Sequence, residues 1–570
     1  MAYNEKELRN KAEAYRKAEN DPLFKKEIED ALSEKNWENL FDRFYTTLAF
    51  GTAGMRGVLG GGTNRINNLI VRKVTQGLSE YLNETSTNPS VVIAYDSRHY
   101  SKEFAMEASL VLAGNGVSVY LYDTLHPVPM LSFAVRYLKT TAGIVITASH
   151  NPAKYNGYKV YWSDGGQVTP PHDFNIAGKA NAVKYEDIHC LTEKQARDKG
   201  LLVPVPESVD EAYYHMVLAS LRRPALVQNS PITVAYTPLH GTGNVPLRHL
   251  LERVGIRCVV VKEQEQPDGS FPTVTLPNPE NPQAMERVIE LAKKVKADIV
   301  LGTDPDADRL GIAIPVSADK KEYKLLTGNQ IAALLCDYLI RSNEELQTEK
   351  RTPLCVKSLV TTDLVKDITL KHGGKCKEVL TGFKYIAEQI AALEGPRGED
   401  EYFLFGCEES YGYLTVPSVR DKDAVSSALV AVEMMCYYAK QGILLQQRLE
   451  AIYDEYGYRS EVVFSRDYEG SAGKERMVSI MTSLRSLKEG DVLAGRTIDS
   501  IEDLLSKTYT GFPPSDVVII HFVGGEKLVV RPSGTEPKIK YYLFLTAPKG
   551  KADLLQQQLP SIVETFKAAL

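Results

Sequence analysis

The sequence predicts an α/β protein of four domains, in which three repeated α/β units with mixed sheets precede a C-terminal α+β domain. The length of 570 residues suits about four domains at ~150 residues each. Short β-branched runs alternate with helix-forming segments in three rounds, and each round ends a buried strand in a polar, glycine-bearing loop. After about Tyr458 the element order changes. The domains we expect are 1–205, 206–325, 326–455 and 456–570.

The composition is that of an ordinary globular protein and argues against two classes of partner. Hydrophobic residues make up 43% of the chain and charged residues 25%, both usual values. The net charge of −6 disfavours nucleic acid or an acidic membrane as the main partner. It does not exclude an anionic substrate, because a pocket can be basic on an acidic protein.

Cysteine usage and the N-terminus predict a cytoplasmic protein. The seven cysteines are scattered from Cys190 to Cys436 without a Cys-x-x-Cys pair, which suits a reducing compartment better than a disulfide framework. The first residues are charged and lack the apolar core of a signal peptide. The most apolar helical stretch, 424–439, is interrupted by Glu433 and is too short to span a bilayer.

The first unit opens with a polar helical cap over 1–42 and a glycine-rich loop over 50–57 that carries Arg56. No Gly-x-x-x-x-Gly-Lys-[Ser/Thr] pattern occurs, so a P-loop nucleotide site is unsupported. The proline-rich stretch 203–206 predicts a linker to the second unit. Between them, periodicity predicts a strand over 91–96, a helix over 104–114, and strands over 117–122 and 143–147.

The later units repeat the alternation, and the C-terminal domain departs from it. The second unit has predicted strands over 232–236, 258–261 and 298–301, and helices over 247–254 and 283–296. The third has predicted helices over 329–340, 363–372, 384–393 and 424–441, and strands over 354–359, 378–380 and 402–405. The last domain has an opening strand, a helix over 473–487, strands over 517–522, 527–531 and 538–545, and a final helix.

Ser149 lies in the turn 147–152 that follows the buried run 143–146, at the edge where open α/β sheets bind ligands. Such a serine can be a turn residue, an acyl-transfer nucleophile or a hydroxyl that carries phosphate. The acyl-transfer interpretation is weak, because Thr147 and Asn151 occupy the glycine places of a nucleophile elbow. On extended backbone the side chain of the neighbouring His150 is expected to diverge from it.

The loop 304–308 places Asp304, Asp306 and Asp308 at alternate positions. On extended backbone these side chains share one face and can converge. Like charges at ~4 Å repel by about 1 kcal/mol per pair even in water, and a bound cation removes that cost. All-oxygen ligation suits Mg²⁺. The alternative is a solvated acidic turn, whereas an EF-hand is excluded because Arg309 and Pro315 stand where glycine and glutamate are needed.

Two further loops offer anion and hydroxyl recognition. Arg531, Ser533, Gly534 and Thr535 follow a predicted strand and combine a guanidinium fork, two hydroxyls and a glycine that lets backbone N–H groups approach phosphate. A plain β-turn is the alternative there. Glu408 and Ser410 supply an acceptor and a donor of the kind that hold sugar hydroxyls, with an acidic surface turn as the alternative.

Two lysines accompany these loops. Lys159 lies ten residues beyond Ser149 and Lys384 follows a predicted strand, although most lysines are merely solvated. Taken together, the loops supply a hydroxyl acceptor, a magnesium cradle, a polyol-binding loop and a phosphate clamp. This combination indicates phosphoryl transfer on a phosphorylated sugar.

The chain resembles the α-D-phosphohexomutase superfamily over nearly its whole length, and looks most like the phosphoglucomutase/phosphopentomutase branch. Four motifs in order carry the resemblance: Thr-Ala-Ser149-His-Asn-Pro with Tyr155-Asn-Gly-Tyr-Lys159, Asp304-Pro-Asp306-Ala-Asp308-Arg309, Glu408-Glu-Ser410-Tyr-Gly, and Arg531-Pro-Ser533-Gly534-Thr535-Glu-Pro.

The resemblance implies four domains around a central cleft and a role for each matching residue. Ser149 would be the phosphoserine, and its phosphate would hold one Mg²⁺ together with Asp304, Asp306 and Asp308. Lys159, Arg56 and the adjacent His150 would lie near the transferred group. The substrate-binding residues would be Arg309, Lys384, Glu408, Ser410, Arg531, Ser533, Gly534 and Thr535.

The implied activity is that of an Mg²⁺-dependent isomerase that interconverts glucose 1-phosphate and glucose 6-phosphate. The phosphoserine enzyme would form a glucose 1,6-bisphosphate intermediate, and this bisphosphate would also be the activator. Alternatives are a phosphopentomutase acting on ribose or deoxyribose 1-phosphate, a glucose 1,6-bisphosphate synthase, a phosphatase and a silent sugar-phosphate-binding protein. We expect a monomer with a phosphosugar substrate and without nucleic acid or membrane partners.

Overall fold

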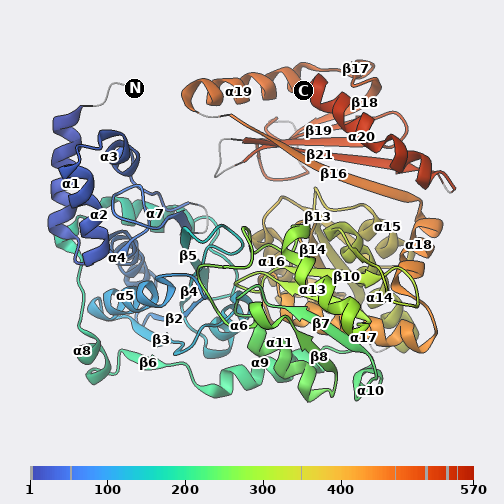
Figure 1. The fold of residues 1–570 in the computed structure, drawn as a ribbon, viewed down its shortest axis with the longest axis horizontal. Helices are drawn as coiled ribbons and strands as arrows, with labels where there is room; N and C mark the ends of the chain where they lie inside the picture. Colours follow the sequence, from blue (N-terminus) through green and yellow to red (C-terminus); the bar gives the residue numbers. More distant parts are fainter. Residues whose placement is uncertain are drawn as a thin grey trace.

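The structure is a computed structural model that describes residues 4–51, 54–347, 349–468, 470–506, 511–533, 538–548 and 550–570. The described chain forms an N-terminal helical cap and four sheets with their own helices. Figure 1 shows the cap and first sheet on the left, the next two units at the lower right, and the C-terminal sheet above the third unit. The predicted fold class is confirmed.

Three helices make the cap: α1 (Glu5–Ala18), α2 (Pro22–Ser33) and α3 (Trp37–Phe44). Each begins at a side chain that accepts hydrogen bonds from first-turn N–H groups, namely Asn4, Asp21 and Asn36. Their apolar faces share one small core with Leu69 of the first domain. The predicted cap is therefore packed against the first domain.

The first sheet has six strands in the order β1-β5-β4-β2-β3-β6. They are β1 (Gly54–Val58), β2 (Ser90–Tyr95), β3 (Ser118–Leu121), β4 (Ala142–Ile146), β5 (Tyr155–Trp162) and β6 (Leu202–Pro204). Helices α4 (Asn68–Thr85), α5 (Ser101–Gly114), α6 (Val128–Leu138), α7 (His172–Ala182) and α8 (Glu193–Asp198) belong to this unit, with a 3₁₀ turn at Tyr185–Asp187. Every residue of β4 is buried, which explains its uninterrupted apolar composition.

The second sheet has the order β11-β10-β9-β7-β8. Its strands are β7 (Thr233–Thr237), β8 (Arg257–Val260), β9 (Ile299–Thr303), β10 (Leu310–Pro315) and β11 (Tyr323–Leu325). The helices of this region are α9 (Glu207–Ala219), α10 (Pro224–Val227), α11 (Asn244–Arg253), α12 (Lys262–Glu265) and α13 (Pro282–Val295).

The third sheet has the order β13-β12-β14-β15. Its strands are β12 (Thr352–Ser358), β13 (Lys375–Val379), β14 (Glu401–Glu408) and β15 (Gly412–Leu414). The helices are α14 (Gly328–Leu346), α15 (Leu364–Lys371), α16 (Phe383–Ala391), α17 (Ala424–Lys440) and α18 (Leu445–Tyr456), with 3₁₀ turns at Ala392–Glu394 and Pro396–Glu399. The cores of the second and third units are continuous.

The three units share one strand order, which confirms the predicted threefold repeat. Each contains an antiparallel strand followed by three mutually parallel strands, as β5-β4-β2-β3, β10-β9-β7-β8 and β15-β14-β12-β13. In each unit, one left-handed residue that is not glycine lies between the central and antiparallel strands: Ser149, Ala307 or Tyr411, with φ of 52°, 50° and 64°. The serine loop, the aspartate loop and the loop with Glu408 and Ser410 therefore occupy the same turn of the repeat.

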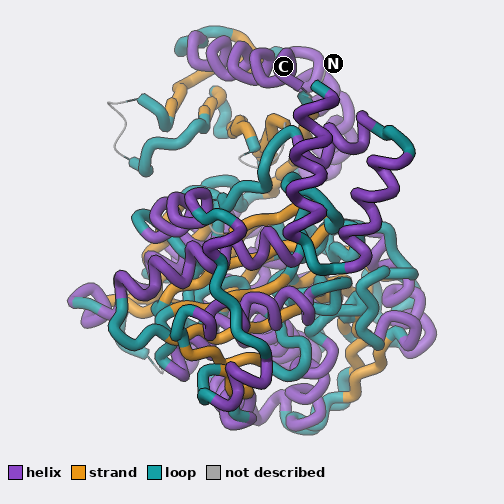
Figure 2. The backbone as a smooth tube through the Cα atoms, turned by 90° about the vertical axis from the view of Figure 1, so that its left-hand side faces the viewer, coloured by secondary structure: helices purple, strands orange, loops and turns teal. Residues whose placement is uncertain are grey.

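The C-terminal domain has one antiparallel sheet in the order β16-β21-β20-β19-β18-β17. Its strands are β16 (Tyr458–Asp467), β17 (Val492–Leu493), β18 (Arg496–Asp503), β19 (Val518–Phe522), β20 (Lys527–Pro532) and β21 (Lys538–Ala547). Helices α19 (Gly470–Ser486) and α20 (Ala552–Ala569) lie on its outer face (Figure 2). The other face packs on Leu359, Val360 and Leu380 of the third unit.

Several elements differ from the predictions. The predicted linker 203–206 instead contributes to β6, which pairs in parallel with β3 and forms the edge of the first sheet. Arg56 lies on β1 and not in a loop, because β1 pairs with β5. Strands β5 and β10 had no predicted element, and both are the antiparallel partners that return the chain from a functional loop. The antiparallel pairing is not readable from the local sequence, although the apolar composition of β10 is.

No single described helix is long and apolar enough to cross a membrane. The helices α17 and α18 pass that test only together, by length and composition, and they are bent by 90° to each other.

Candidate active site

Ser149 and Asp304 bring the first two units together. The Ser149 hydroxyl donates a hydrogen bond of 2.7 Å to Asp304 Oδ2, and Ser149 is 3% exposed. His150 Nδ1 lies 3.0 Å from the same hydroxyl oxygen. The expected divergence of these two side chains is therefore wrong, because Ser149 adopts a left-handed backbone with φ of 52° instead of an extended one. Burial holds the pKa of His150 well below its ordinary value, so the imidazole is neutral.

The strained serine turn is held by buried groups at the end of β2. The Arg98 guanidinium donates to the carbonyl oxygens of Ser149, Asn151, Pro152 and Tyr155. Asp96 Oδ2 accepts from Thr147 Oγ1 at 2.6 Å, and Thr147 Oγ1 accepts from the Ser149 N–H at 2.8 Å. Because one rigid cation satisfies four carbonyl groups, the turn is set before any ligand binds.

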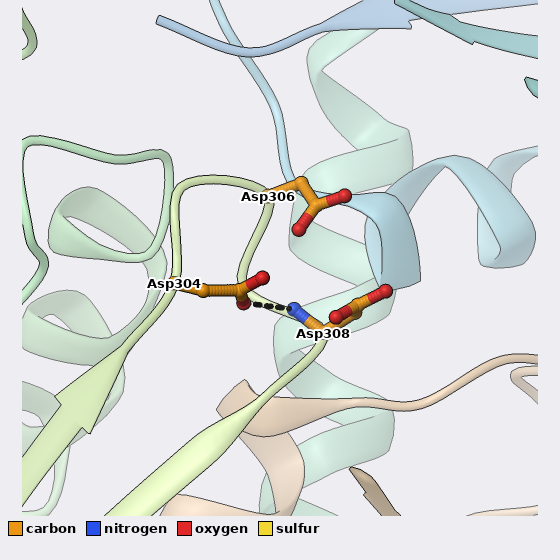
Figure 3. A group of neighbouring side chains, drawn as sticks. All are labelled: Asp304, Asp306 and Asp308. Carbon is orange, nitrogen blue, oxygen red and sulfur yellow. Dashed lines mark hydrogen bonds between the residues drawn. The ribbon is translucent and has the colours of Figure 1, made fainter. Parts of the chain in front are cut away.

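Asp304, Asp306 and Asp308 converge, with their ligand atoms within 4.8 Å of one another. The expected extended backbone is wrong, because the chain turns here: the Ala307 N–H donates to Asp304 O at 3.0 Å and Ala307 is left-handed. Asp304 Oδ1 then accepts from the Asp308 N–H at 3.1 Å (Figure 3). The three carboxylates face one point, as predicted, through a tight turn.

These carboxylates are buried and only partly satisfied. Asp306 Oδ1 and Asp308 Oδ1 have no hydrogen-bond partner among the described residues. Burial and the charges of Asp306 and Asp308 raise the pKa of Asp304 well above its ordinary value. Three oxygen donors with unused lone pairs fit a hard divalent cation, and a thiolate- or imidazole-seeking metal would find no ligand in this group.

Three cations surround the acidic loop. Lys159 Nζ lies 2.9 Å from Asp306 Oδ2 and 3.6 Å from Asp308 Oδ2. Arg309 pairs with Glu280, and its backbone N–H donates to Asp304. Burial by itself raises the pKa of Asp308, but Lys422, Lys159 and Arg309 outweigh it and hold that pKa below the ordinary value.

Lys422 is the site residue that the sequence interpretation missed. Its Nζ lies 3.1 Å from Asp308 Oδ2 and 2.9 Å from Asp421 Oδ1. The sequence does contain a feature that marks Lys422: residues 420–423 are four consecutive charged residues directly before the apolar helix α17. A charged run is usually a solvated surface. Here it is buried, since Arg420, Asp421 and Asp423 are each at most 2% exposed.

The loop with Glu408 and Ser410 lies at the end of β14. Glu408 is buried and accepts a hydrogen bond of 2.7 Å from the Gly382 N–H, which connects this loop to the start of the helix that carries Lys384. Ser410 is half-buried beside it. Glu409, between them, accepts from Ser358 Oγ at 3.1 Å, and burial raises its pKa to about 7. The loop thus presents carboxylates and a hydroxyl that suit sugar hydroxyls.

The C-terminal domain reaches the third unit through Arg531. This arginine, on β20, donates to Thr381 Oγ1 next to Gly382. Ser533 is half-buried directly after β20, whereas Gly534 and Thr535 lie outside the described residues. Arg56 is exposed on β1 and donates to Asn151 Oδ1 of the serine turn at 2.8 Å. The predicted site residues therefore come from all four domains.

Family models match three parts of the chain. They are the α/β/α domains I, II and III of phosphoglucomutase/phosphomannomutase, at residues 47–187, 211–316 and 327–456. Together they cover more than half of the chain.

Curated relatives match almost the full length. The phosphoglucomutase of Staphylococcus epidermidis is 37% identical over 540 residues, which are 92% of this chain and 96% of that protein. A phosphoglucomutase of Staphylococcus aureus is 38% identical over 518 residues, with 89% and 91% covered.

Solved structures share the fold. The open form of pp63/parafusin, a phosphoglucomutase of Paramecium, gives a TM-score of 0.71 at 18% identity, over 92% of this chain and 95% of that one. A phosphoglucomutase/phosphomannomutase family protein from Burkholderia thailandensis gives 0.67 at 17% identity, over 92% and 98%.

Proposed function

The chain belongs to the phosphoglucomutase/phosphomannomutase family of the α-D-phosphohexomutase superfamily, and from this membership we propose an Mg²⁺-dependent phosphoglucomutase that works through phosphorylated Ser149. It interconverts glucose 1-phosphate and glucose 6-phosphate, as an isomerase. The phosphoserine role is supported by the hydrogen bond of 2.7 Å from the Ser149 hydroxyl to Asp304, a residue of the buried acidic turn.

Ser149 exchanges a phosphoryl group with the sugar. In the first transfer the bond from phosphorus to Ser149 Oγ breaks and a bond to a free sugar hydroxyl oxygen forms, which yields glucose 1,6-bisphosphate. The proton of that hydroxyl leaves as Ser149 Oγ regains one, and the neutral His150 Nδ1, 3.0 Å away, is placed to exchange a hydrogen with this oxygen. The second transfer reverses these bonds at the other phosphate, after the bisphosphate has turned over. Free glucose 1,6-bisphosphate would activate the enzyme by phosphorylating Ser149.

Asp304, Asp306 and Asp308 would hold one Mg²⁺ together with an oxygen of the Ser149 phosphate. A bound divalent cation would stabilise the charge that develops on the transferred phosphoryl oxygens. Around this point Lys159, Lys422 and Arg309 add positive charge at fixed positions, as phosphoryl transfer requires. Arg56 would serve the same group from β1, where it donates to Asn151 of the serine turn.

The other end of the substrate is read by the third and fourth domains. Glu408 and Ser410 would bind sugar hydroxyls, and Lys384 would contact the substrate from the start of α16. Arg531, Ser533, Gly534 and Thr535 would clamp the phosphate that does not react, because a guanidinium fork with hydroxyls recognises either phosphate by charge and shape. Arg531 already contacts Thr381 beside the sugar loop, which supports this shared pocket.

The boundaries of the four domains near residues 205, 325 and 455 are part of this proposal, as are a monomeric state and a cytoplasmic location. One chain supplies residues of every domain to the site. The seven cysteines are free thiols, which suits a reducing compartment.

The test compares Ser149→Ala with Ser109→Ala. Both serines are buried, but Ser109 only bonds the backbone of its own helix at Ala105 O. With Mg²⁺ and catalytic glucose 1,6-bisphosphate, we expect Ser149→Ala to lose interconversion and phosphate incorporation, and Ser109→Ala to keep both. Retained turnover in Ser149→Ala would contradict the phosphoserine role. If the wild-type enzyme prefers ribose 1-phosphate, or forms the bisphosphate from an acyl phosphate, the substrate assignment is wrong. The phosphoserine role of Ser149 would still hold.

A further inference from the structure

Four consecutive charged residues before α17 each contact a different part of the molecule. Arg420 pairs with Glu394, and its N–H donates to Ser132 of α6 at 2.9 Å. Asp423 accepts from Tyr213 of α9 at 2.9 Å and caps α17. Between them, Asp421 and Lys422 point toward the first domain and the acidic turn. The segment 420–423 is therefore the place where the third unit meets the first two beside the active site.

Asp421 has all of its hydrogen-bonding capacity filled. Its Oδ2 accepts from the Tyr161 hydroxyl at 2.8 Å and from Gln167 Nε2 at 2.9 Å. Its Oδ1 accepts from the Lys422 N–H at 2.8 Å and from Lys422 Nζ at 2.9 Å. Asp421 is 1% exposed, so these four donors replace water and fix the carboxylate in one orientation.

The Lys422 side chain contacts other groups along its whole length. A Cβ at Gly412 would lie 2.3 Å from Lys422 Cδ, so the side chain passes directly over a position that only glycine leaves open. Lys422 Nζ lies 5.4 Å from the centre of the Phe383 ring and ends between Asp421 and Asp308 Oδ2, the latter at 3.1 Å. A flexible side chain is thus held at one point beside the acidic turn.

Strand β5 is connected to two of the three cations around that turn: it carries Lys159 itself and contacts Lys422 through Asp421. Lys159 and Tyr161 are two residues apart, so they share a face of the strand. Lys159 reaches Asp306 and Asp308 itself, whereas Tyr161 holds the carboxylate that holds Lys422. Gln167 is the bridge partner of Tyr161 on the returning chain and binds the same oxygen.

We propose that Asp421, anchored by Tyr161 and Gln167, is a positioning residue that sets Lys422 against the acidic turn for phosphoryl transfer. This inference rests on the proposed function. Loss of the anchor leaves the phosphate clamp and sugar loop in place, so it lowers the rate of transfer more than the apparent affinity for substrate.

The experiment compares Tyr161→Phe with Tyr158→Phe. Both tyrosines are fully buried on β5 and both lose one hydroxyl hydrogen bond, to Asp421 at 2.8 Å or to Thr75 at 3.0 Å. Their side chains belong to opposite faces and separate cores. The pair therefore matches in size and burial, and each variant loses one hydroxyl hydrogen bond, but only Tyr161 is connected to Lys422.

We expect kcat for glucose 1-phosphate to fall about tenfold in Tyr161→Phe and further in Asp421→Asn, with KM changed less than about twofold, because the lost interaction acts on the transition state. Tyr158→Phe is expected to keep wild-type kcat, with a similar change in Tm to Tyr161→Phe. Wild-type kcat in Tyr161→Phe, or an equal loss in Tyr158→Phe, would overturn the proposal. If Asp421→Asn does not fold, the tyrosine pair still decides. If Ser149→Ala stays active, the proposed function fails instead.

Discussion

The Ser149 hydroxyl donates to Asp304 Oδ2 across 2.7 Å, so the turns of two repeated units touch at this hydroxyl. A phosphate on Ser149 would stand beside three buried carboxylates, two of which have an oxygen without a hydrogen-bond partner in the part of the chain that the structure describes. The repulsion in such a site is strong, because burial weakens the screening of like charges. A group of three converging carboxylates of this kind could hold a metal ion.

Removal of divalent cations is expected to abolish activity, and Mg²⁺ is expected to restore it. Asp306→Asn should raise the Mg²⁺ concentration for half-maximal activity by about tenfold, since one charged ligand becomes neutral. Titration of chelator-treated enzyme with Mg²⁺ measures this. Asp319→Asn, at a solvated turn where Asp319 pairs only with neighbours, is the control. Full activity in the presence of excess chelator would contradict a metal site.

Lys159→Met should lower kcat by about a hundredfold, comparable to the loss of one donor to a developing charge. Lys159 is the cation of β5 that reaches Asp306 and Asp308 directly, at 2.9 and 3.6 Å. Steady-state kinetics with glucose 1-phosphate checks this, and the exposed Lys102→Met on α5 serves as control. Equal kcat values for the two variants would remove Lys159 from the catalytic group.

Arg531→Lys should raise KM by about tenfold or more and change kcat less. A lysine keeps the charge but loses the bidentate fork and the contact with Thr381 Oγ1. Arg496→Lys, at an ion pair with Glu526 in the same domain, is the matched substitution. Measured KM values for glucose 1-phosphate decide the question, and an unchanged KM in Arg531→Lys would argue against the phosphate clamp.

Glu409 should make the protein less stable as pH rises toward neutrality. The pKa of Glu409 is about 7 in the folded protein, whereas an unfolded glutamate ionises near ~4.3. As pH rises between these values, ionisation stabilises the unfolded state relative to the folded state. The stability lost between those two values is up to roughly 4 kcal/mol and does not grow further above the folded pKa. Below the pKa of the unfolded state, Glu409 is protonated in both states and no longer changes the free energy of unfolding.

Glu409→Gln tests this sign, because glutamine imitates the protonated side chain and still offers an acceptor to Ser358. Thermal unfolding at pH 5 and pH 8 should show a smaller loss of Tm in the variant than in wild type. Parallel losses in both proteins would show that the Glu409 pKa is not raised.

Much of the fold was predictable because buried strands and amphipathic helices leave local signatures. The run before Ser149 is apolar because β4 is buried throughout, and that pattern predicted both the strand and the functional turn after it. The strands β5 and β10 were missed, although β10 is a fully buried apolar run of the same kind as β4. Tertiary pairing also converted the predicted linker into β6.

The sequence by itself determined which chemical groups the candidate site contains: a serine hydroxyl, three carboxylates, the carboxylate and hydroxyl of Glu408 and Ser410, and the guanidinium of Arg531. Only the tertiary structure decided how they meet. The left-handed backbone at Ser149 and Ala307 turns side chains inward that extended backbone would separate. Lys422 enters the site from 114 residues beyond Asp308, a distance at which no local pattern operates, because contact there depends on the packing of three domains.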